Sequence, residues 1–155
     1  MTDILPRSTA RPGIRVIALC VLRRGDAILV ERDYDRVLQQ TYYRPPGGGL
    51  LFGERAADAV RREMREELGV ELADLQPLGV LENLFMFEDE PGHEIVFVFA
   101  ARALDEALYR SDAVALLEDD GSRHVAEWQP LDRLAGPDTL LYPPGLLSLI
   151  PEPPR

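Results

Sequence analysis

The chain of 155 residues contains no lysine, only one cysteine and no long apolar run. Without lysine, mechanisms that use a lysine nucleophile or a Schiff base are excluded. The single cysteine, Cys20, cannot form an intramolecular disulfide, and its apolar neighbours predict a packed thiol rather than a nucleophile. No run approaches the roughly 20 apolar residues that span a bilayer, and residues 1–7 lack the apolar core of a signal peptide. We therefore expect a cytoplasmic protein that does not enter a membrane.

Basic charge is also scarce, since 17 arginines face 27 acidic residues and the formal net charge is −10. A protein that binds long nucleic acid through its phosphates needs a basic surface, so a nucleic-acid polymer is not the expected partner. A small phosphorylated substrate remains compatible with this charge, because divalent cations can bridge carboxylates and phosphates.

The length and the ordinary proportion of apolar residues (46%) predict one domain over residues 1–155, with 1–13 and 151–155 loosely ordered. Apolar, β-branched runs predict strands, and glycine, proline and acidic clusters predict the turns between them. A charged loop is expected at 32–36, one long helix from about residue 54 to 69, and a shorter helix near the C-terminus. Strands are expected at 15–22, 27–31, 42–46, 75–87, 95–101 and 124–128. This order favours an α/β/α sandwich with a central mixed β-sheet.

The segment 48–70 joins a glycine-rich turn to a strongly acidic helix. Glu63 and Glu67 are one helical turn apart and Glu66 lies between them, so their carboxylates can meet on one edge of the helix. Like charges so placed destabilise a helix unless they are neutralised, and a hard cation such as Mg²⁺ would neutralise them. The alternative is a solvent-exposed helix with ion pairs such as Arg62–Glu66.

The residues Gly48, Glu54 and the run from Arg62 to Val70 resemble the signature of the Nudix (MutT-like) hydrolases at every fixed position. The signature is glycine, five residues, glutamate, seven residues, then Arg-Glu-apolar-x-Glu-Glu-x-Gly-apolar. The resemblance implies a Nudix α/β/α fold and a hydrolase that cleaves the diphosphate of a nucleoside diphosphate derivative, assisted by Mg²⁺ or Mn²⁺. It also implies the following roles: metal ligands Glu63, Glu66 and Glu67; orientation of the glutamates by Arg62 with Glu54; shaping of the motif by Gly48 and Gly69.

Residues beyond this motif are less determined by the sequence. The base that activates water could be Glu63 or an acidic residue outside the motif. The candidates for this base, or for an additional metal ligand, are Glu118, Asp119, Asp120 and Glu94. Substrate contacts are expected from Arg32 and Arg44, which could hold phosphate, and from Tyr43 and Phe85, which could stack on a base. Two other functions stay open: a non-catalytic module that senses a nucleotide or metabolite, and an RNA 5′-end pyrophosphohydrolase. A homodimer is possible because Nudix proteins often dimerise.

Overall fold

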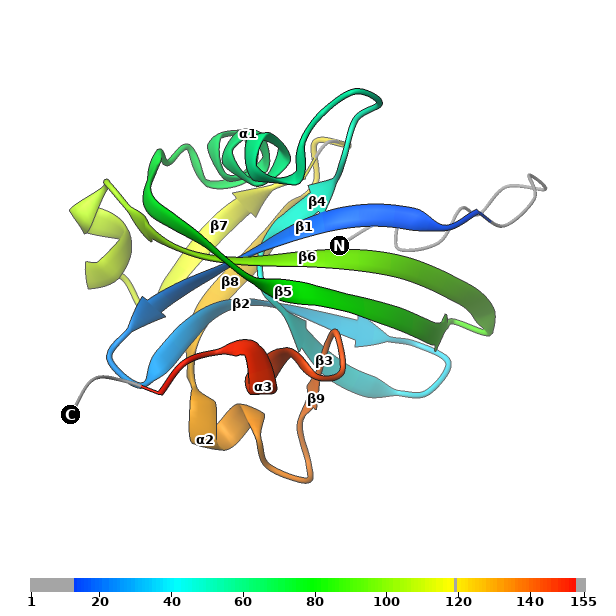
Figure 1. Ribbon diagram of the computed structural model, residues 1–155. Coiled ribbons are helices and arrows are strands. Elements are labelled where there is room, and N and C mark those ends of the chain that lie inside the picture. Colours follow the sequence, from blue (N-terminus) through cyan, green and yellow to red (C-terminus); the bar gives the residue numbers. More distant parts are fainter. Residues whose placement is uncertain (1–12, 119, 153–155) are drawn as a thin grey trace.

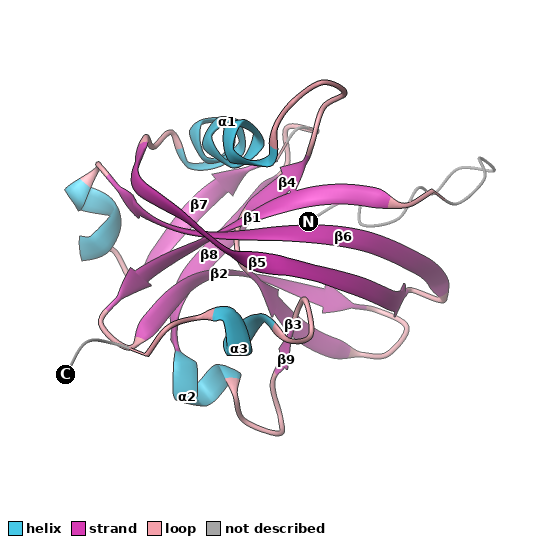
Figure 2. Ribbon diagram, viewed as in Figure 1, coloured by secondary structure: helices cyan, strands magenta, loops and turns pink. Residues whose placement is uncertain are grey.

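The computed structural model describes residues 13–118 and 120–152. Two twisted layers of strands form its centre, with helix α1 on one side and helices α2 and α3 on the other (Figures 1 and 2). In chain order the elements are β1 (Arg15–Arg24), β2 (Ala27–Asp35), β3 (Gln40–Arg44), β4 (Gly47–Gly49), α1 (Ala56–Leu68), β5 (Leu72–Phe87), β6 (Glu90–Ala103), the 3-10 turn η1 (Glu106–Arg110), β7 (Ala113–Leu117), β8 (Arg123–Pro130), α2 (Leu131–Leu134), β9 (Leu140–Leu141) and α3 (Leu146–Leu149).

The strands form a mixed sheet in the order β5-β6-β1-β2-β3-β9, with β4 beside β1, and β8 between β2 and β7. Most pairs are antiparallel, whereas β1 pairs with β6 in parallel and β3 pairs with β9 in parallel. Strands β1 and β2 pair only at their hairpin end, from Arg23 to Ile28. Beyond that end β1 pairs with β4 and β2 pairs with β3, so the segment 40–49 follows the two strands where they separate. Strand β8 pairs with β2 at Ala27–Glu31.

Strand β1 separates two apolar cores, because its side chains alternate between its faces. Ala18, Cys20 and Leu22 pack beneath Val60 and Met64 of α1. On the opposite face the core includes Ile17, Leu19 and Val21 from β1, Leu134 from α2 and Leu146 from α3. Burial raises the pKa of the Cys20 thiol to about 12, in agreement with the expected packed cysteine.

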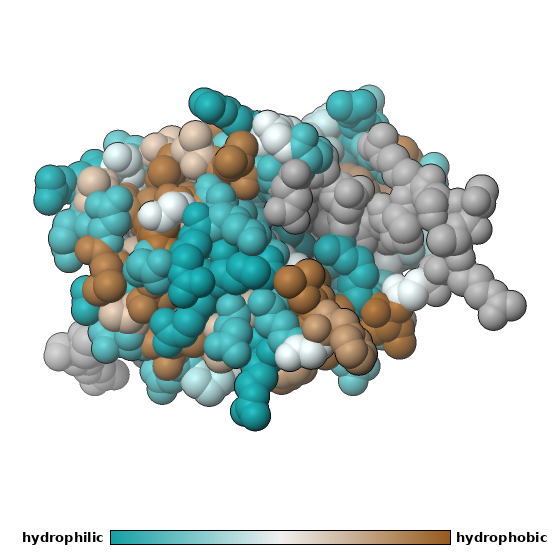
Figure 3. Space-filling model, turned by 90° about the horizontal axis from the view of Figure 1, so that it is seen from above, coloured by the Kyte–Doolittle hydropathy of each residue, from teal (hydrophilic) through white to brown (hydrophobic). Residues whose placement is uncertain are grey.

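Helix α1 is amphipathic, with buried Ala59, Val60 and Met64 recurring at helical spacing. It ends at Gly69, whose φ of 68° and N–H bonds to the carbonyls of Arg65 and Met64 form a left-handed C-terminal cap. Viewed from the side that carries α1, hydrophilic residues run through the middle of the visible face (Figure 3). The helix therefore presents its polar side outward while its apolar side closes the first core.

The expected mixed sheet with few helices is confirmed, and several boundaries differ. The prediction of a charged loop at 32–36 is wrong for residues 32–35, because β2 continues to Asp35 and pairs with β3 along its polar end, and only Arg36 lies in the turn that follows. Strand β7 was not anticipated, and the C-terminal helix is a single turn. The predictions for residues 1–12, 119 and 153–155 lie outside the described residues. Within 13–118 and 120–152, no helix is long and apolar enough to cross a membrane.

Candidate active site

Two neighbouring glycines, Gly47 and Gly48, bring the chain against β1 and against Glu63 of α1. A Cβ on Gly47 would lie 2.0 Å from the carbonyl oxygen of Ala18, so the pairing of β4 with β1 requires glycine there. A Cβ on Gly48 would lie 2.6 Å from the carboxyl carbon of Glu63. The missing side chain at Gly48 thus leaves the space in which the Glu63 carboxylate rests.

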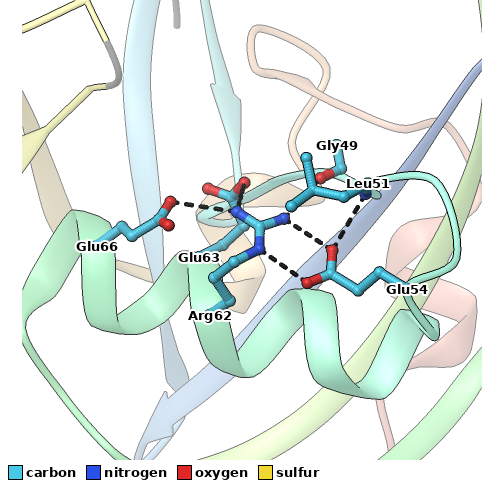
Figure 4. A network of polar contacts seen from close by, with 6 residues as sticks. All are labelled: Gly49, Leu51, Glu54, Arg62, Glu63 and Glu66. Atoms are coloured by element: carbon cyan, nitrogen blue, oxygen red, sulfur yellow. Dashed lines mark hydrogen bonds and ion pairs between the residues drawn. The ribbon is translucent and has the colours of Figure 1, made fainter.

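Arg62 holds three carboxylates and one carbonyl in a single network (Figure 4). Its Nε and Nη2 donate to both oxygens of Glu54, at 2.8 and 2.9 Å. Its Nη1 donates to Glu63 at 2.9 Å and Glu66 at 3.2 Å, and Nη2 also donates to the carbonyl of Gly49 at 2.9 Å. Such fork-shaped contacts fix direction as well as distance, so the glycine turn and the acidic edge of α1 are held in one arrangement.

Glu54 anchors that network to the turn before the helix. It accepts a hydrogen bond from the N–H of Leu51 at 3.1 Å in addition to those from Arg62. The hydrogen bonds from Arg62 and then from Leu51 lower the pKa of Glu54 to about 2. Glu54 is therefore ionised at neutral pH, and its two hydrogen bonds with Arg62 orient that guanidinium.

The glutamates of the helix differ in exposure. Glu63 and Glu67 are buried, whereas the Glu66 side chain is about 45% exposed and turns toward Arg62. Burial first, and then the negative charges of Glu31, Glu118 and Glu63, raise the pKa of Glu67 to about 10. Its Oε2 has no hydrogen-bond partner among the described residues. A buried carboxylate crowded by others in this way is suited to a hard divalent cation, so the residues present fit the metal that the motif implies.

Two further acidic residues complete the surroundings of Glu67. Glu31, at the middle of β2, is only 2% exposed, and Glu118 follows β7. Burial and the adjacent Glu31 raise the pKa of Glu118 to about 7. The positive charge of Arg44 opposes the shifts of both Glu67 and Glu118. Sequence reasoning missed Glu31; the only signal was a carboxylate ending an apolar strand.

A narrow pocket lies beside this cluster, between β3, β5, β6 and the segment after β9. Arg44 and Phe85, both expected to contact substrate, line it together with Glu94. Asn83, which sequence reasoning missed, donates to Glu94 at 3.4 Å. Each of these three polar residues, Arg44, Asn83 and Glu94, has a buried side-chain atom without a hydrogen-bond partner in the described part of the chain. Arg44 thus belongs to both the pocket and the acidic cluster.

Other expected site residues lie elsewhere. Arg32 forms an ion pair with Glu127 at 3.6 Å, and together with Tyr43 it borders an open groove beside Arg133. Tyr43 is otherwise packed in the second core. Asp120 is exposed and accepts the N–H of Ser122, and Asp119 is outside the described residues. The structure therefore brings Glu118 and Arg44 to the helix carboxylates but directs Arg32 and Tyr43 to another surface.

Comparison with known proteins agrees with this geometry. The NUDIX domain model matches residues 12–146. An RNA pyrophosphohydrolase of Pseudomonas aeruginosa is 27% identical over 129 residues, 76% of this chain and 81% of that protein. A MutT NUDIX hydrolase from Burkholderia pseudomallei has a TM-score of 0.62 at 24% identity, covering 90% of this chain and 99% of the other. A NUDIX hydrolase from Nitrosomonas europaea has a TM-score of 0.60 at 17% identity, covering 90% and 86%. The chain belongs to the NUDIX domain family and is a Nudix hydrolase.

Proposed function

We propose that the protein is a divalent-metal-dependent pyrophosphohydrolase that cleaves the diphosphate linkage of a nucleoside diphosphate derivative. The observation that carries the proposal is the Arg62 network, which fixes Glu63 and Glu66 beside the glycine turn while Glu67 is buried next to them. Arg62 compensates part of the repulsion between Glu63 and Glu66, and a divalent cation bound to Glu63, Glu66 and Glu67 would compensate the rest.

The residues Glu63, Glu66 and Glu67 would hold Mg²⁺ or Mn²⁺. When bound, such an ion neutralises phosphate charge, polarises the phosphorus centre and lowers the pKa of water. Arg62 keeps Glu63 and Glu66 in place and is itself kept in place by Glu54. The protein thus presents carboxylate oxygens in a fixed arrangement, so that the site needs little reorganisation during the reaction.

The pocket beside the cluster is the proposed place for the part of the substrate that the diphosphate carries. Phe85 supplies an aromatic surface there, and Arg44 lies where the pocket adjoins the acidic cluster. A guanidinium in this position can bind a phosphate oxygen and hold the diphosphate across the two regions. The sugar or base would then lie against Phe85 and the buried polar pair Asn83–Glu94.

A panel of nucleoside triphosphates, nucleotide sugars and dinucleotides, incubated with the protein and Mg²⁺, tests the proposal by release of phosphate, pyrophosphate or a nucleoside monophosphate. Glu66→Gln and Glu67→Gln are expected to lower turnover at least 100-fold, because each removes a charged ligand. Glu71→Gln is the matched control, since Glu71 pairs with Arg65 on the exposed side of the helix. Unaltered rates in the first two variants would contradict the proposal, as would tight binding without turnover under any divalent metal.

A second candidate, RNA 5′-end pyrophosphohydrolase, is favoured by the curated relatives from Pseudomonas and Saccharophagus, which carry that name. The net charge of −10 opposes it, because an RNA chain extending from the site would meet an acidic protein. Comparing kcat/KM for a 5′-triphosphorylated oligoribonucleotide and for the matching free nucleoside triphosphate separates the two. Preference for the oligonucleotide that grows at low salt would support this second function.

A further inference from the structure

A histidine and two glutamates converge beside the Nudix motif but belong to none of its positions. Glu31 comes from β2, Glu118 follows β7, and His124 comes from β8. One ligand atom of each lies within 4.8 Å of the others. The three come together because β8 pairs with both β2 and β7, which sets Glu31 opposite Ala126 and His124 opposite Leu116.

The spacing between His124 and Glu31 is compatible with two ligands of one ion. The Nδ1 of His124 lies 4.0 Å from Oε1 of Glu31, which is too far for a hydrogen bond. Nitrogen and oxygen ligands bind transition metals at about 2.0–2.2 Å, so two ligands of one ion are at most about 4.2 Å apart. The observed separation falls within that limit, and small rotations of the Glu118 side chain can supply the third ligand.

The histidine ring is already oriented for binding. Its Nε2 lies 3.2 Å from the hydroxyl of Ser122, and its Nδ1 faces Glu31. A ring that donates through Nε2 presents the lone pair of Nδ1 toward the carboxylates. A ligating imidazole is commonly held by such a bond on its other nitrogen.

Glu67, already named as a ligand of the motif metal, lies between the two regions. Its Oε2 is buried and has no hydrogen-bond partner among the residues that the structure describes. The two carboxylates that act most strongly on Glu67 are Glu31 and Glu118, ahead of Glu63 on its own helix. Glu67 therefore lies near enough to Glu31 and Glu118 for a cation held by the trio to act on its charge as well.

We propose that Glu31, Glu118 and His124, with Glu67 shared from α1, form a second divalent-cation site that contains one nitrogen ligand. An imidazole with carboxylates favours a transition metal such as Mn²⁺ or Zn²⁺ over Mg²⁺, which prefers oxygen alone. The site extends the carboxylate set of the Nudix motif away from Arg62 and toward β8. The site is formed by the substrate-free protein, so the proposal does not depend on which substrate is cleaved.

Electron paramagnetic resonance on the substrate-free protein loaded with Mn²⁺ tests this site directly. A spin-echo measurement should show coupling to an imidazole nitrogen, and ¹⁵N-labelled histidine should change that coupling. The coupling should vanish in His124→Ala and persist in His93→Ala. His93 is the other histidine of the chain and lies in β6, opposite Leu84 of β5. Zn²⁺ should displace the nitrogen-coupled Mn²⁺ first, because it binds such ligands more tightly.

A binding titration with Mn²⁺ gives the affinity of the same site. His124→Ala and the isosteric Glu31→Gln should each weaken the nitrogen-coupled ion at least about tenfold, whereas Glu66→Gln should leave the nitrogen coupling intact. Absence of nitrogen coupling in the folded wild-type protein at saturating Mn²⁺ would overturn the proposal. Hydrolysis supported by Mg²⁺ is measured separately, so a failure of this site and a failure of the proposed pyrophosphohydrolase remain distinguishable.

Discussion

Replacing Glu67 by glutamine should stabilise the metal-free protein while abolishing its activity. Glu67 is 7% exposed, and burial and neighbouring carboxylates raise its pKa from an ordinary 4.5 to about 10. At pH 7 the folded protein therefore retains a proton that the unfolded chain releases. Since the folded state binds the additional proton, the free energy of unfolding falls as pH rises above 4.5.

The magnitude follows from the pH interval alone. Each pH unit above the ordinary pKa of 4.5 lowers the free energy of unfolding by about 1.4 kcal/mol. Because pH 7 is two and a half units above 4.5, Glu67 lowers the free energy of unfolding by about 3 kcal/mol at pH 7. This figure holds for any folded pKa well above 7. Glutamine is of similar size and never ionises, so Glu67→Gln should be up to about 3 kcal/mol more stable at pH 7 and less than about 1 kcal/mol more stable at pH 5.

Urea denaturation in EDTA at pH 5, 6, 7 and 8 measures the difference between the two proteins. Glu118 titrates in both proteins, so its contribution largely cancels in that difference. Glu66→Gln is the matched control, because an exposed ion pair contributes only about 0–1 kcal/mol and should show no such pH dependence. A Glu67→Gln protein that is less stable at every pH, or a difference that does not grow with pH, would refute the reasoning.

Three shorter predictions concern the turn, the network and the core. Gly48→Ala should lower kcat about 100-fold with the fold retained, because the new methyl group displaces the Glu63 carboxylate. Gly47→Ala should instead lower Tm strongly, because its methyl group clashes with the backbone of β1. Kinetics measure the first effect, and thermal unfolding followed by circular dichroism measures the second. Arg62→Lys should lower kcat/KM about 10- to 100-fold, since an ammonium cannot contact both oxygens of Glu54 and reach Glu63, and rates equal to wild type would contradict that role. Cys20 should resist iodoacetamide at pH 8 until the protein is unfolded, as read by mass spectrometry, because burial raises its pKa to about 12.

The helix of the motif was predictable because its signals are local. Apolar residues at helical spacing and Gly69 at its end specify α1 within two residues of the expected start. The hairpin at Gly25 follows equally from its immediate sequence. Each of these features depends on residues within about one or two helical turns, so no knowledge of distant pairing is needed.

The polar end of β2 shows why other parts were not predictable. The run from Arg32 to Asp35 is charged enough to resemble a loop, yet it pairs with β3, and Asp35 accepts the N–H groups of Val37 and Leu38 in the turn that follows. Pairing with a distant strand and a side chain that caps its own turn outweigh composition here.

The same register determines which expected contacts reach the site. Glu31 lies opposite Arg44, and Arg32 lies opposite Tyr43. Because side chains alternate along a strand, each pair shares a face and the two pairs face opposite ways. Arg44 is thus placed with Glu31 at the carboxylates, while Arg32 and Tyr43 border the separate groove. A sequence shows the charges but not the register that separates them.

Charge balance within the cluster favours the proposed binding of cations. Arg62 pairs with Glu54, Glu63 and Glu66, and the positive charge of Arg44 acts on both Glu67 and Glu118. One guanidinium beside Glu31, Glu67 and Glu118 leaves negative charge in a buried place, which is unfavourable without further compensation. Proton uptake by Glu67 offers one compensation and metal binding offers another, and the two compete. Metal affinity should consequently rise steeply with pH, which makes the acidic site most effective above neutrality.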